Sequence, residues 1–315
     1  MLIERIVRTY FDTRGSYRRT AKSIDRKLSH MHIYRIIDRL GQNCKNCVQV
    51  AEELHPKWSG ILGLDGKTIK ISGEQFVLLL AVDLGTQDIV DAWLARHEDY
   101  YNIRPFVREI KKKIGYEPKF AVIDLDQAWK EAVSEIYPNV QIQYCVVHFE
   151  RIFDREIPLR NRTEKQHELK SLVRKVLYAP TYEEARETLE EILFCRKTRY
   201  FRDRKSLKMI RSLQGNFDHL TTHFRIPSHF RANNITEGVN NLVQMRLDLI
   251  RGYKKRESAW NSLKLIMMHY RFNPFESCKD STKNGKCPLD FTGIDTSKLD
   301  WIAYCLKDPS TLDQL

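Results

Sequence analysis

The sequence predicts an α/β protein in which a mixed sheet carries a helical insertion and is preceded by an all-α domain. The first observation is a helical spacing of apolar residues over residues 1–41. The second is a change of periodicity after residue 57, where short apolar runs with turn signals alternate with helical segments. With 315 residues, 42% of them hydrophobic, the chain is long enough for one large core and one or two smaller domains.

The amino-terminal residues 1–41 are expected to form three short helices. Ser16 can cap the second, over residues 17–24, while Ser29 can cap the third and Gly41 can end it. A tight connection between the second and third helices is typical of a helix-turn-helix, whose third helix enters the major groove of DNA. The alternative is a small helical bundle with a basic surface. The cations expected to contact DNA are Arg18, Arg19, Arg35 and Arg39.

Residues 42–57 are expected to be a linker, and residues 58–150 the first part of the sheet domain. Three strands, a helix, a strand, a helix and a strand follow one another there, which is the order of a ribonuclease-H-like sheet. In a sheet of that order the first and fourth strands are neighbours. The expected strands lie near 58–72, 76–83, 89–96, 119–123 and 140–144, and the expected helices near 103–114 and 128–137.

The second half of the chain changes character. Residues 151–225 are helical and basic, and we expect them to form an insertion in the sheet domain. Residues 226–275 are expected to return to that domain as one or two long helices. Residues 276–315 form a tail that the sequence pattern does not assign.

Charge is segregated along the chain. Residues 1–57 hold 12 Lys and Arg against 6 Asp and Glu, residues 58–150 hold 10 against 14, and residues 151–275 hold 26 against 14. Two basic blocks favour a polyanionic partner, and the acidic block between them favours metal binding. The pattern therefore predicts binding to a nucleic acid.

Composition argues against several classes of protein. No apolar run approaches the roughly 18 to 20 residues of a membrane span, and the amino-terminal stretch lacks a secretory signal pattern, so a cytoplasmic, nucleoid-associated protein is expected. Seven cysteines in a long chain do not suggest a disulfide scaffold. A structural zinc is not expected, because Cys44 and Cys47 would need further ligands such as Cys278 and Cys287, whose spacing fits no common zinc ribbon.

Three carboxylates stand out by their position. Asp65 ends the first apolar run, Asp124 ends the fourth strand, and Glu237 lies near the start of a helix. Two divalent metals about 3.5 to 4 Å apart, held by such carboxylates, can activate a water or a 3′-hydroxyl and neutralise the leaving oxygen of a phosphodiester. Taken singly, the three residues also fit a turn residue, a helix N-cap and a charge in the first turn of a helix.

Four motifs, in this order, resemble those of DDE transposases of the Mutator-like and related prokaryotic insertion-sequence type. Gly63–Lys67 resembles their first-Asp motif and Val122–Asp124 their second. Cys145-Val-Val-His148 resembles their Cys-x-x-His motif, and Asn233–Asn241 is similar to their Asn-x-x-Glu-x-x-Asn segment. The resemblance covers about residues 58–275.

The resemblance implies a ribonuclease-H-like core with Asp65, Asp124 and Glu237 as catalytic ligands of two Mg²⁺ or Mn²⁺ ions. It implies a DNA transposase that binds transposon ends, cleaves them and joins them to target DNA. Its expected partners are therefore double-stranded terminal repeats and target DNA, and pairing of two ends implies a homodimer or higher assembly. The other residues singled out are Cys145, His148, Asn234 and Asn241 in supporting roles, and Arg246 and Arg251 as phosphate contacts.

Two points stay open at this stage. The second Asp of these transposases is usually followed by a small residue, whereas here Leu125 and Asp126 follow Asp124, so Asp126 is an alternative or an assisting ligand. The same fold also suits a domesticated DNA-binding protein without catalysis, or a structure-selective nuclease.

Overall fold

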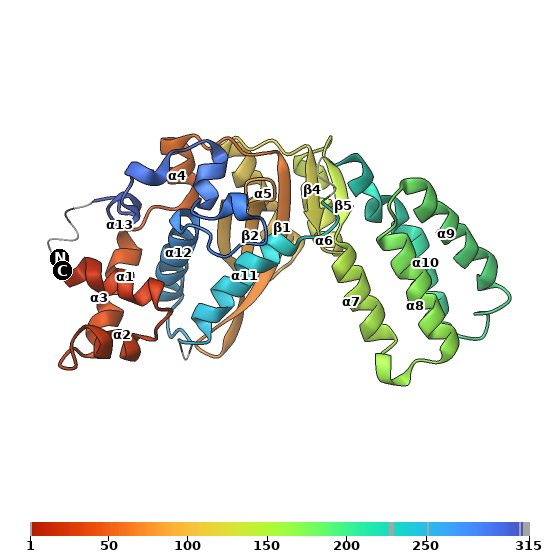
Figure 1. Cartoon of the computed structure of the whole chain (residues 1–315), viewed down its shortest axis with the longest axis horizontal. Coiled ribbons are helices and arrows are strands. Elements are labelled where there is room, and N and C mark those ends of the chain that lie inside the picture. Colours follow the sequence, from red (N-terminus) through yellow and green to blue (C-terminus); the bar gives the residue numbers. More distant parts are fainter. Residues whose placement is uncertain (1, 227–229, 251, 309, 311–315) are drawn as a thin grey trace. The chain divides into compact units, whose positions relative to one another are not determined.

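The computed structural model describes residues 2–226, 230–250, 252–308 and 310 and divides the chain into two compact units (Figure 1). Both units are discontinuous in sequence. Unit 1 comprises Met1–Gly60, Asp65–Glu117 and Ile235–Leu315, and unit 2 comprises Ile61–Leu64 and Pro118–Asn234.

Three helices open unit 1: α1 (Leu2–Asp12), α2 (Tyr17–Ile24) and α3 (His30–Asn43). Both predicted caps are confirmed, since the hydroxyl of Ser16 accepts the backbone N–H of Arg19 and that of Ser29 accepts the N–H of Met31. Each cap satisfies a backbone donor that has no partner inside the helix. The bounds of α2 are those that the sequence predicts.

Gly41 does not end α3, which was the expectation from sequence. The helix runs on to Asn43 and packs against α12 (Arg256–Phe272). A Cβ atom on residue 41 would lie 2.4 Å from the carbonyl oxygen of Asn261. Gly41 is therefore needed for a close helix–helix approach and not for a helix terminus.

The expected linker, residues 42–57, contains helix α4 (Cys47–Leu54), which corrects the prediction. Asn46 and Gln49 form a reciprocal capping box at its start. Cys47, Val50 and Ala51 are buried, and the helix packs on strand β3 (Ile89–Ala95). The segment is polar enough to resemble a linker, yet its single apolar face is covered by the sheet.

The sheet has the strand order β3-β2-β1-β4-β5, so the fold is mixed α/β. β2 and β3 are antiparallel, whereas β4 pairs in parallel with both β1 and β5. β1 runs through Asp65 to Ile71, within the range 58–72 that the sequence predicts; its first four residues belong to unit 2 and the rest to unit 1. The strands are β1 (Ile61–Ile71), β2 (Glu74–Asp83), β3 (Ile89–Ala95), β4 (Phe120–Ile123) and β5 (Gln141–Tyr144).

Unit 1 is completed by helices and by the carboxy-terminal tail. Helix α5 (Tyr100–Glu109) continues as the π-helix η1 (Ile110–Ile114), and α11 (Asn234–Leu247) precedes α12. The tail, which the sequence left unassigned, forms short 3₁₀ helices and α13. Its apolar side chains lie in the same hydrophobic cluster as those of α1 and α3. The tail elements are η5 (Ser281–Lys283), η6 (Pro288–Thr292), η7 (Thr296–Lys298) and α13 (Trp301–Cys305).

A buried ion pair fastens α12 to the turn before β3. The Nε and Nη2 atoms of Arg271 each lie 2.8 Å from one oxygen of the Asp88 carboxylate, and both side chains are fully buried. The indole N–H of Trp58 donates to the same carboxylate at 3.0 Å. Bidentate geometry and a third donor offset the cost of removing both charges from water.

Asp91 on β3 is a second buried carboxylate, and it makes stability depend on pH. Burial raises the pKa of Asp91 to about 7, although its bonds to the peptide N–H of Ala92 and to Trp93, and the charge of Arg271, act in the opposite direction. An acid whose pKa is higher in the folded state binds more protons there, so its contribution to stability falls as pH rises from about 4 to about 7.

Replacing Asp91 by Asn should remove this loss. We compare the free energy of unfolding of the variant with that of the unchanged chain. The difference between them should increase in favour of the variant by about a few kcal/mol from pH 4 to pH 8. Urea unfolding at a series of pH values measures this difference. A difference that stays constant over that range would contradict the assignment.

Unit 2 combines β4 and β5 with a set of helices. Residues 151–225 are helical, as predicted, and α8, α9 and α10 lie side by side (Figure 1). The buried amide of Gln143 on β5 joins them to the sheet, because it donates to the carbonyl of Leu220 and accepts the N–H of His223. The helices are α6 (Gln127–Ile136), α7 (Val146–Glu156), η2 (Leu159–Asn161), α8 (Glu164–Leu177), α9 (Tyr182–Arg196), α10 (Arg204–Leu220) and η3 (Thr222–Arg225).

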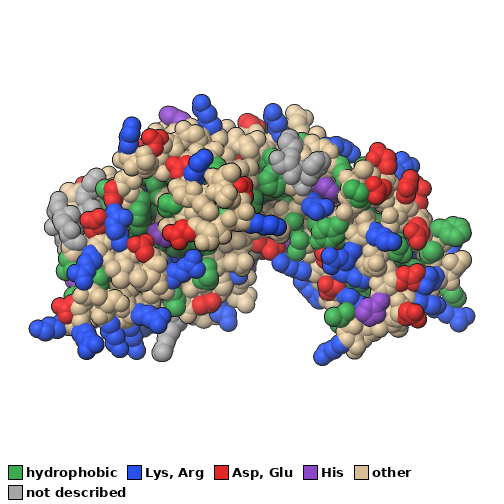
Figure 2. Space-filling view, viewed as in Figure 1, with side chains coloured by type: hydrophobic (Ala, Val, Ile, Leu, Met, Phe, Trp, Pro, Cys, Tyr) green, Lys and Arg blue, Asp and Glu red, His purple; other side chains and the backbone are tan. Residues whose placement is uncertain are grey.

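The basic surface of these helices is mixed with acidic side chains. Figure 2 shows Lys and Arg interleaved with Asp and Glu over α8, α9 and α10. Several of the cations form ion pairs, among them Lys208 with Glu156 and Lys170 with Glu150. Among the described residues, no helix combines the length and the apolar character that a membrane span requires.

Candidate functional site

Asp65 lies inside β1 and is half-buried. Its Oδ2 atom accepts a hydrogen bond of 2.6 Å from the side-chain amide of Asn240, and its Oδ1 atom accepts the N–H of Gly66 at 2.9 Å. A Cβ atom on residue 66 would lie 2.2 Å from the carboxylate of Glu98, so any larger residue there would displace that flexible side chain. The Asp65 carboxylate is thus held in one orientation.

Glu237 lies in the first turn of α11 and is half-buried. Asn240 follows it by three residues, so the two side chains lie on the same face of the helix. Since Asn240 bonds to Asp65, the helix face that carries Glu237 is anchored to the strand that carries Asp65.

Two asparagines do the positioning, and neither is one that the sequence singled out. Asn234 and Asn241 are exposed. Their neighbours Asn233 and Asn240 are buried, and the side chain of Asn233 donates to the carbonyl of Leu64 at 2.8 Å. The motif contains two adjacent Asn pairs, 233–234 and 240–241. Helical spacing could have identified Asn240 as the buried member of the second pair, because it lies four residues after the buried Thr236 and so on the same face of the helix.

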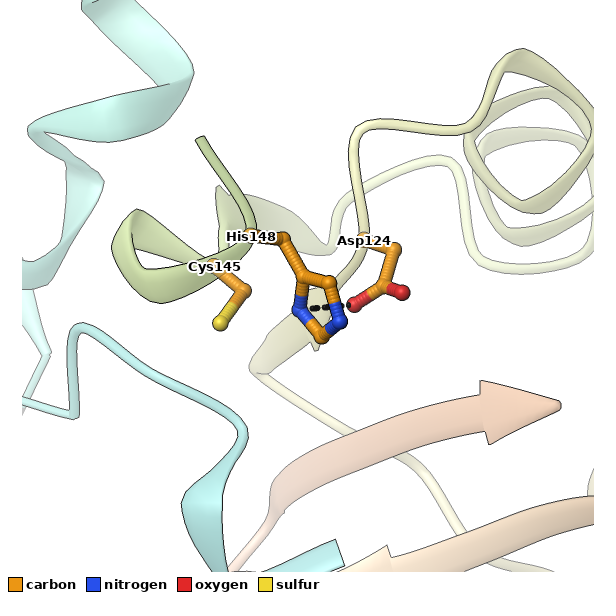
Figure 3. Close-up of side chains that lie close together, drawn as sticks. All are labelled: Asp124, Cys145 and His148. Carbon is orange, nitrogen blue, oxygen red and sulfur yellow. Dashed lines mark ion pairs between the residues drawn. The ribbon is translucent and has the colours of Figure 1, made fainter. Parts of the chain in front are cut away.

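In unit 2, Asp124 lies next to the Cys-x-x-His motif, Cys145–His148. Ile123 pairs with Tyr144, and the N–H of Cys145 donates to the carbonyl of Ile123 at 2.8 Å, so Asp124 and Cys145 follow two paired strand ends. Helix α7 then brings His148 over Asp124, with 2.7 Å between His148 Nδ1 and Asp124 Oδ1 (Figure 3).

The Asp124–His148 contact is a charged pair. Burial by itself lowers the pKa of His148, but hydrogen bonds to Asp124 and Cys145 raise it to about 10. The raised pKa favours the imidazolium form beside the carboxylate, while the Nη1 atom of Arg151 lies 3.2 Å from the other ring nitrogen, Nε2.

Asp126 has a separate role. Its Oδ1 atom accepts the N–H of Ala128 at 2.7 Å, so Asp126 is the N-cap of α6. The N-cap alternative weighed for Asp124 thus applies to Asp126, and the carboxylate of Asp124 is left for the pair with His148.

The Mutator-family transposase model matches residues 13–274 of the sequence. The chain belongs to the Mutator family of transposases. The match runs from α2 through α12 and includes every carboxylate described above. A comparison with curated proteins gave no match. Family membership makes DNA the partner of this transposase and DNA cleavage its class of reaction.

The basic residues predicted to contact DNA differ in their surroundings in this transposase. Arg18, Arg19, Arg35 and Arg39 are exposed on α2 and α3. Arg246 is instead a core residue, which corrects its assignment as a surface phosphate contact: it is 5% exposed. Its guanidinium donates to the carbonyls of Tyr10 and Phe11, near the end of α1, and packs against both rings. Arg251 lies outside the described residues.

Metal-ligating side chains gather at one place in the described part of the transposase. Asp124, Cys145 and His148 each offer one ligand atom, and these three atoms all lie within 4.8 Å of one another. The four cysteines weighed as a zinc set form no such group among the described residues; the thiol of Cys44 donates to the carbonyl of Lys45 at 3.4 Å.

Proposed function

We propose that this transposase cleaves and joins DNA with a ribonuclease-H-like core in which Asp65, Asp124 and Glu237 are the catalytic carboxylates. The pairing of β1 with β4 carries the proposal. The strands are parallel with Gly63 opposite Val122, and each aspartate comes two residues after its paired residue. In the strand order β3-β2-β1-β4-β5, the first and fourth strands are neighbours, which supports the proposal.

The donor chemistry of the three residues fits Mg²⁺ or Mn²⁺, because hard divalent cations prefer carboxylate oxygens. When bound, two such ions activate the attacking oxygen and neutralise charge on the leaving oxygen of the phosphodiester. The protein's own contribution is to hold the carboxylates. Asn240 fixes Asp65, and His148 holds Asp124 through the 2.7 Å ion pair.

DNA binding is proposed for the amino-terminal helices. Arg18 and Arg19 on α2 and Arg35 and Arg39 on α3 are exposed, as expected of a helix-turn-helix that reads transposon ends. Two ends must be paired before they are joined to a target, which favours a dimeric or higher assembly on the terminal repeats.

Replacing Glu237 by Gln tests the proposal. Purified protein should cut DNA that carries the element ends in the presence of Mn²⁺, and the variant should lose at least about 1,000-fold in cleavage rate. Glu257→Gln is the matched control, because Glu257 is an exposed first-turn glutamate of α12.

Equal cleavage by the Glu237 variant and the unchanged chain would refute the catalytic assignment. Specific binding to element ends without any cleavage would favour a domesticated DNA-binding protein. Cleavage without preference for any sequence would favour a structure-selective nuclease.

A further inference from the structure

We propose that Asp124, Cys145 and His148 form a second kind of metal site, one that selects Zn²⁺ or Co²⁺ over Mg²⁺. All three residues belong to unit 2. The binding itself needs no other part of the proposed catalytic centre. Its effect on catalysis rests on the proposed function, because Asp124 is shared.

The strand pairing and the helix that follows it bring the three donors together. Asp124 and Cys145 are the residues directly after the paired ends of β4 and β5. Cys145 is the N-cap residue of α7, and His148 follows it by three residues, so both side chains lie on one face of the first turn. Figure 3 shows the imidazole of His148 between the thiol of Cys145 and the carboxylate of Asp124.

The distances suit a small tetrahedral ion. Zinc lies about 2.0 to 2.3 Å from O, N and S ligands, which places its ligands roughly 3.3 to 3.8 Å apart. The carboxylate and imidazole of Asp124 and His148 are 2.7 Å apart, and no pair of the three donor atoms is separated by more than 4.8 Å. Small rotations of the half-buried side chains of Asp124 and His148 toward the buried thiol of Cys145 cover both differences.

The donor set decides which ion is bound. A thiolate and a neutral imidazole are ligands of zinc and cobalt, whereas Mg²⁺ takes oxygen. Binding therefore releases the thiol proton of Cys145 and the imidazolium proton of His148 to the solvent. Three protein ligands leave a fourth position open, as in zinc sites that exchange a water or a substrate group. The N–H of Asn233 donates to the sulfur of Cys145 at 3.4 Å, which fixes the direction of the thiol.

A consequence for the reaction follows. An ion at this site takes the carboxylate of Asp124 away from the oxygen-ligated metals of the proposed centre. Zn²⁺ should therefore inhibit cleavage that is supported by Mg²⁺, at zinc concentrations far below those of magnesium.

Titration of the full chain with Co²⁺, without DNA or Mg²⁺, tests the binding. The intact protein should show the charge-transfer absorption of a thiolate bound to cobalt, and Zn²⁺ should abolish it. Cys145→Ser should lose this absorption, whereas Cys195→Ser should keep it, because Cys195 is a half-buried cysteine of the same unit. His148→Gln should weaken zinc binding at least about 10-fold.

Unchanged cobalt absorption in a folded Cys145→Ser chain would overturn the proposal. If that variant does not fold, the half-buried His148 decides: unchanged zinc affinity in His148→Gln would overturn it as well. Failure of the intact chain to cleave DNA would refute the proposed function and leave this binding test unaffected.

Discussion

Replacing Asp65 by Asn should reduce metal-dependent DNA cleavage by at least about 1,000-fold, with little effect on folding. The amide has nearly the size of the carboxylate, and its one oxygen can still accept the N–H of Gly66. Its NH₂ group then takes the place of the oxygen that faced Asn240, and a turn of the Asn240 amide lets that residue accept where it donated before. Asparagine at position 65 lacks the negative charge that a hard divalent cation requires, and the loss of several kcal/mol of transition-state stabilisation corresponds to that factor. Single-turnover cleavage of labelled DNA measures the rate.

Asn240→Ala is the graded companion of this variant. Asn240 touches the carboxylate only through one hydrogen bond of 2.6 Å, so it positions the ligand and does not supply charge. Its loss should cost about 10- to 100-fold in rate. Excess Mn²⁺ should restore part of that activity and none of the activity of Asp65→Asn. Equal losses in the two variants would contradict this division of roles.

Replacing Arg271 by Leu should destabilise the protein by about 3–5 kcal/mol, because it leaves the carboxylate of Asp88 buried without its cation. Both side chains have no exposed surface, so water cannot take over the role of the guanidinium. The remaining donor to the carboxylate, the indole N–H of Trp58, is a neutral group. Denaturant unfolding followed by circular dichroism measures the change.

The double variant Asp88→Asn with Arg271→Leu provides the control. It removes both charges, so its loss of stability should be smaller than the sum of the two single losses. An additive result would show that the two residues act independently, in conflict with the two contacts of 2.8 Å.

What could be predicted from the sequence was determined by local interactions. Ser16 and Ser29 cap helices within three residues of themselves, so their hydroxyls mark α2 and α3 without any tertiary information. Gly41 has the residue type of a helix end, but the backbone at Asn261, 220 positions away in sequence, decides its role. Arg246 was misassigned for the same reason, because its partners are the carbonyls of Tyr10 and Phe11.

The candidate site shows the same limit. The Cys-x-x-His motif is visible in the sequence, and its two side chains share a helix turn. The contact of His148 with Asp124 depends on Ile123 pairing with Tyr144, which no local pattern reveals. Choosing Asn240 over Asn241 likewise required knowing which face of α11 is turned toward β1.

The core of unit 1 combines segments that lie far apart in the sequence, and this affects folding during synthesis. Ile6 near the start and Leu306 near the end lie in one hydrophobic cluster. A ribosome adds about 5 to 20 residues per second, so the apolar faces of the first helices wait on the order of 15 to 60 seconds for the last ones. During that interval those faces remain uncovered, and uncovered apolar surface promotes aggregation. The core that holds Asp65 and Glu237 is completed only once the carboxy-terminal residues have been synthesised, so we expect a prematurely terminated chain to be inactive.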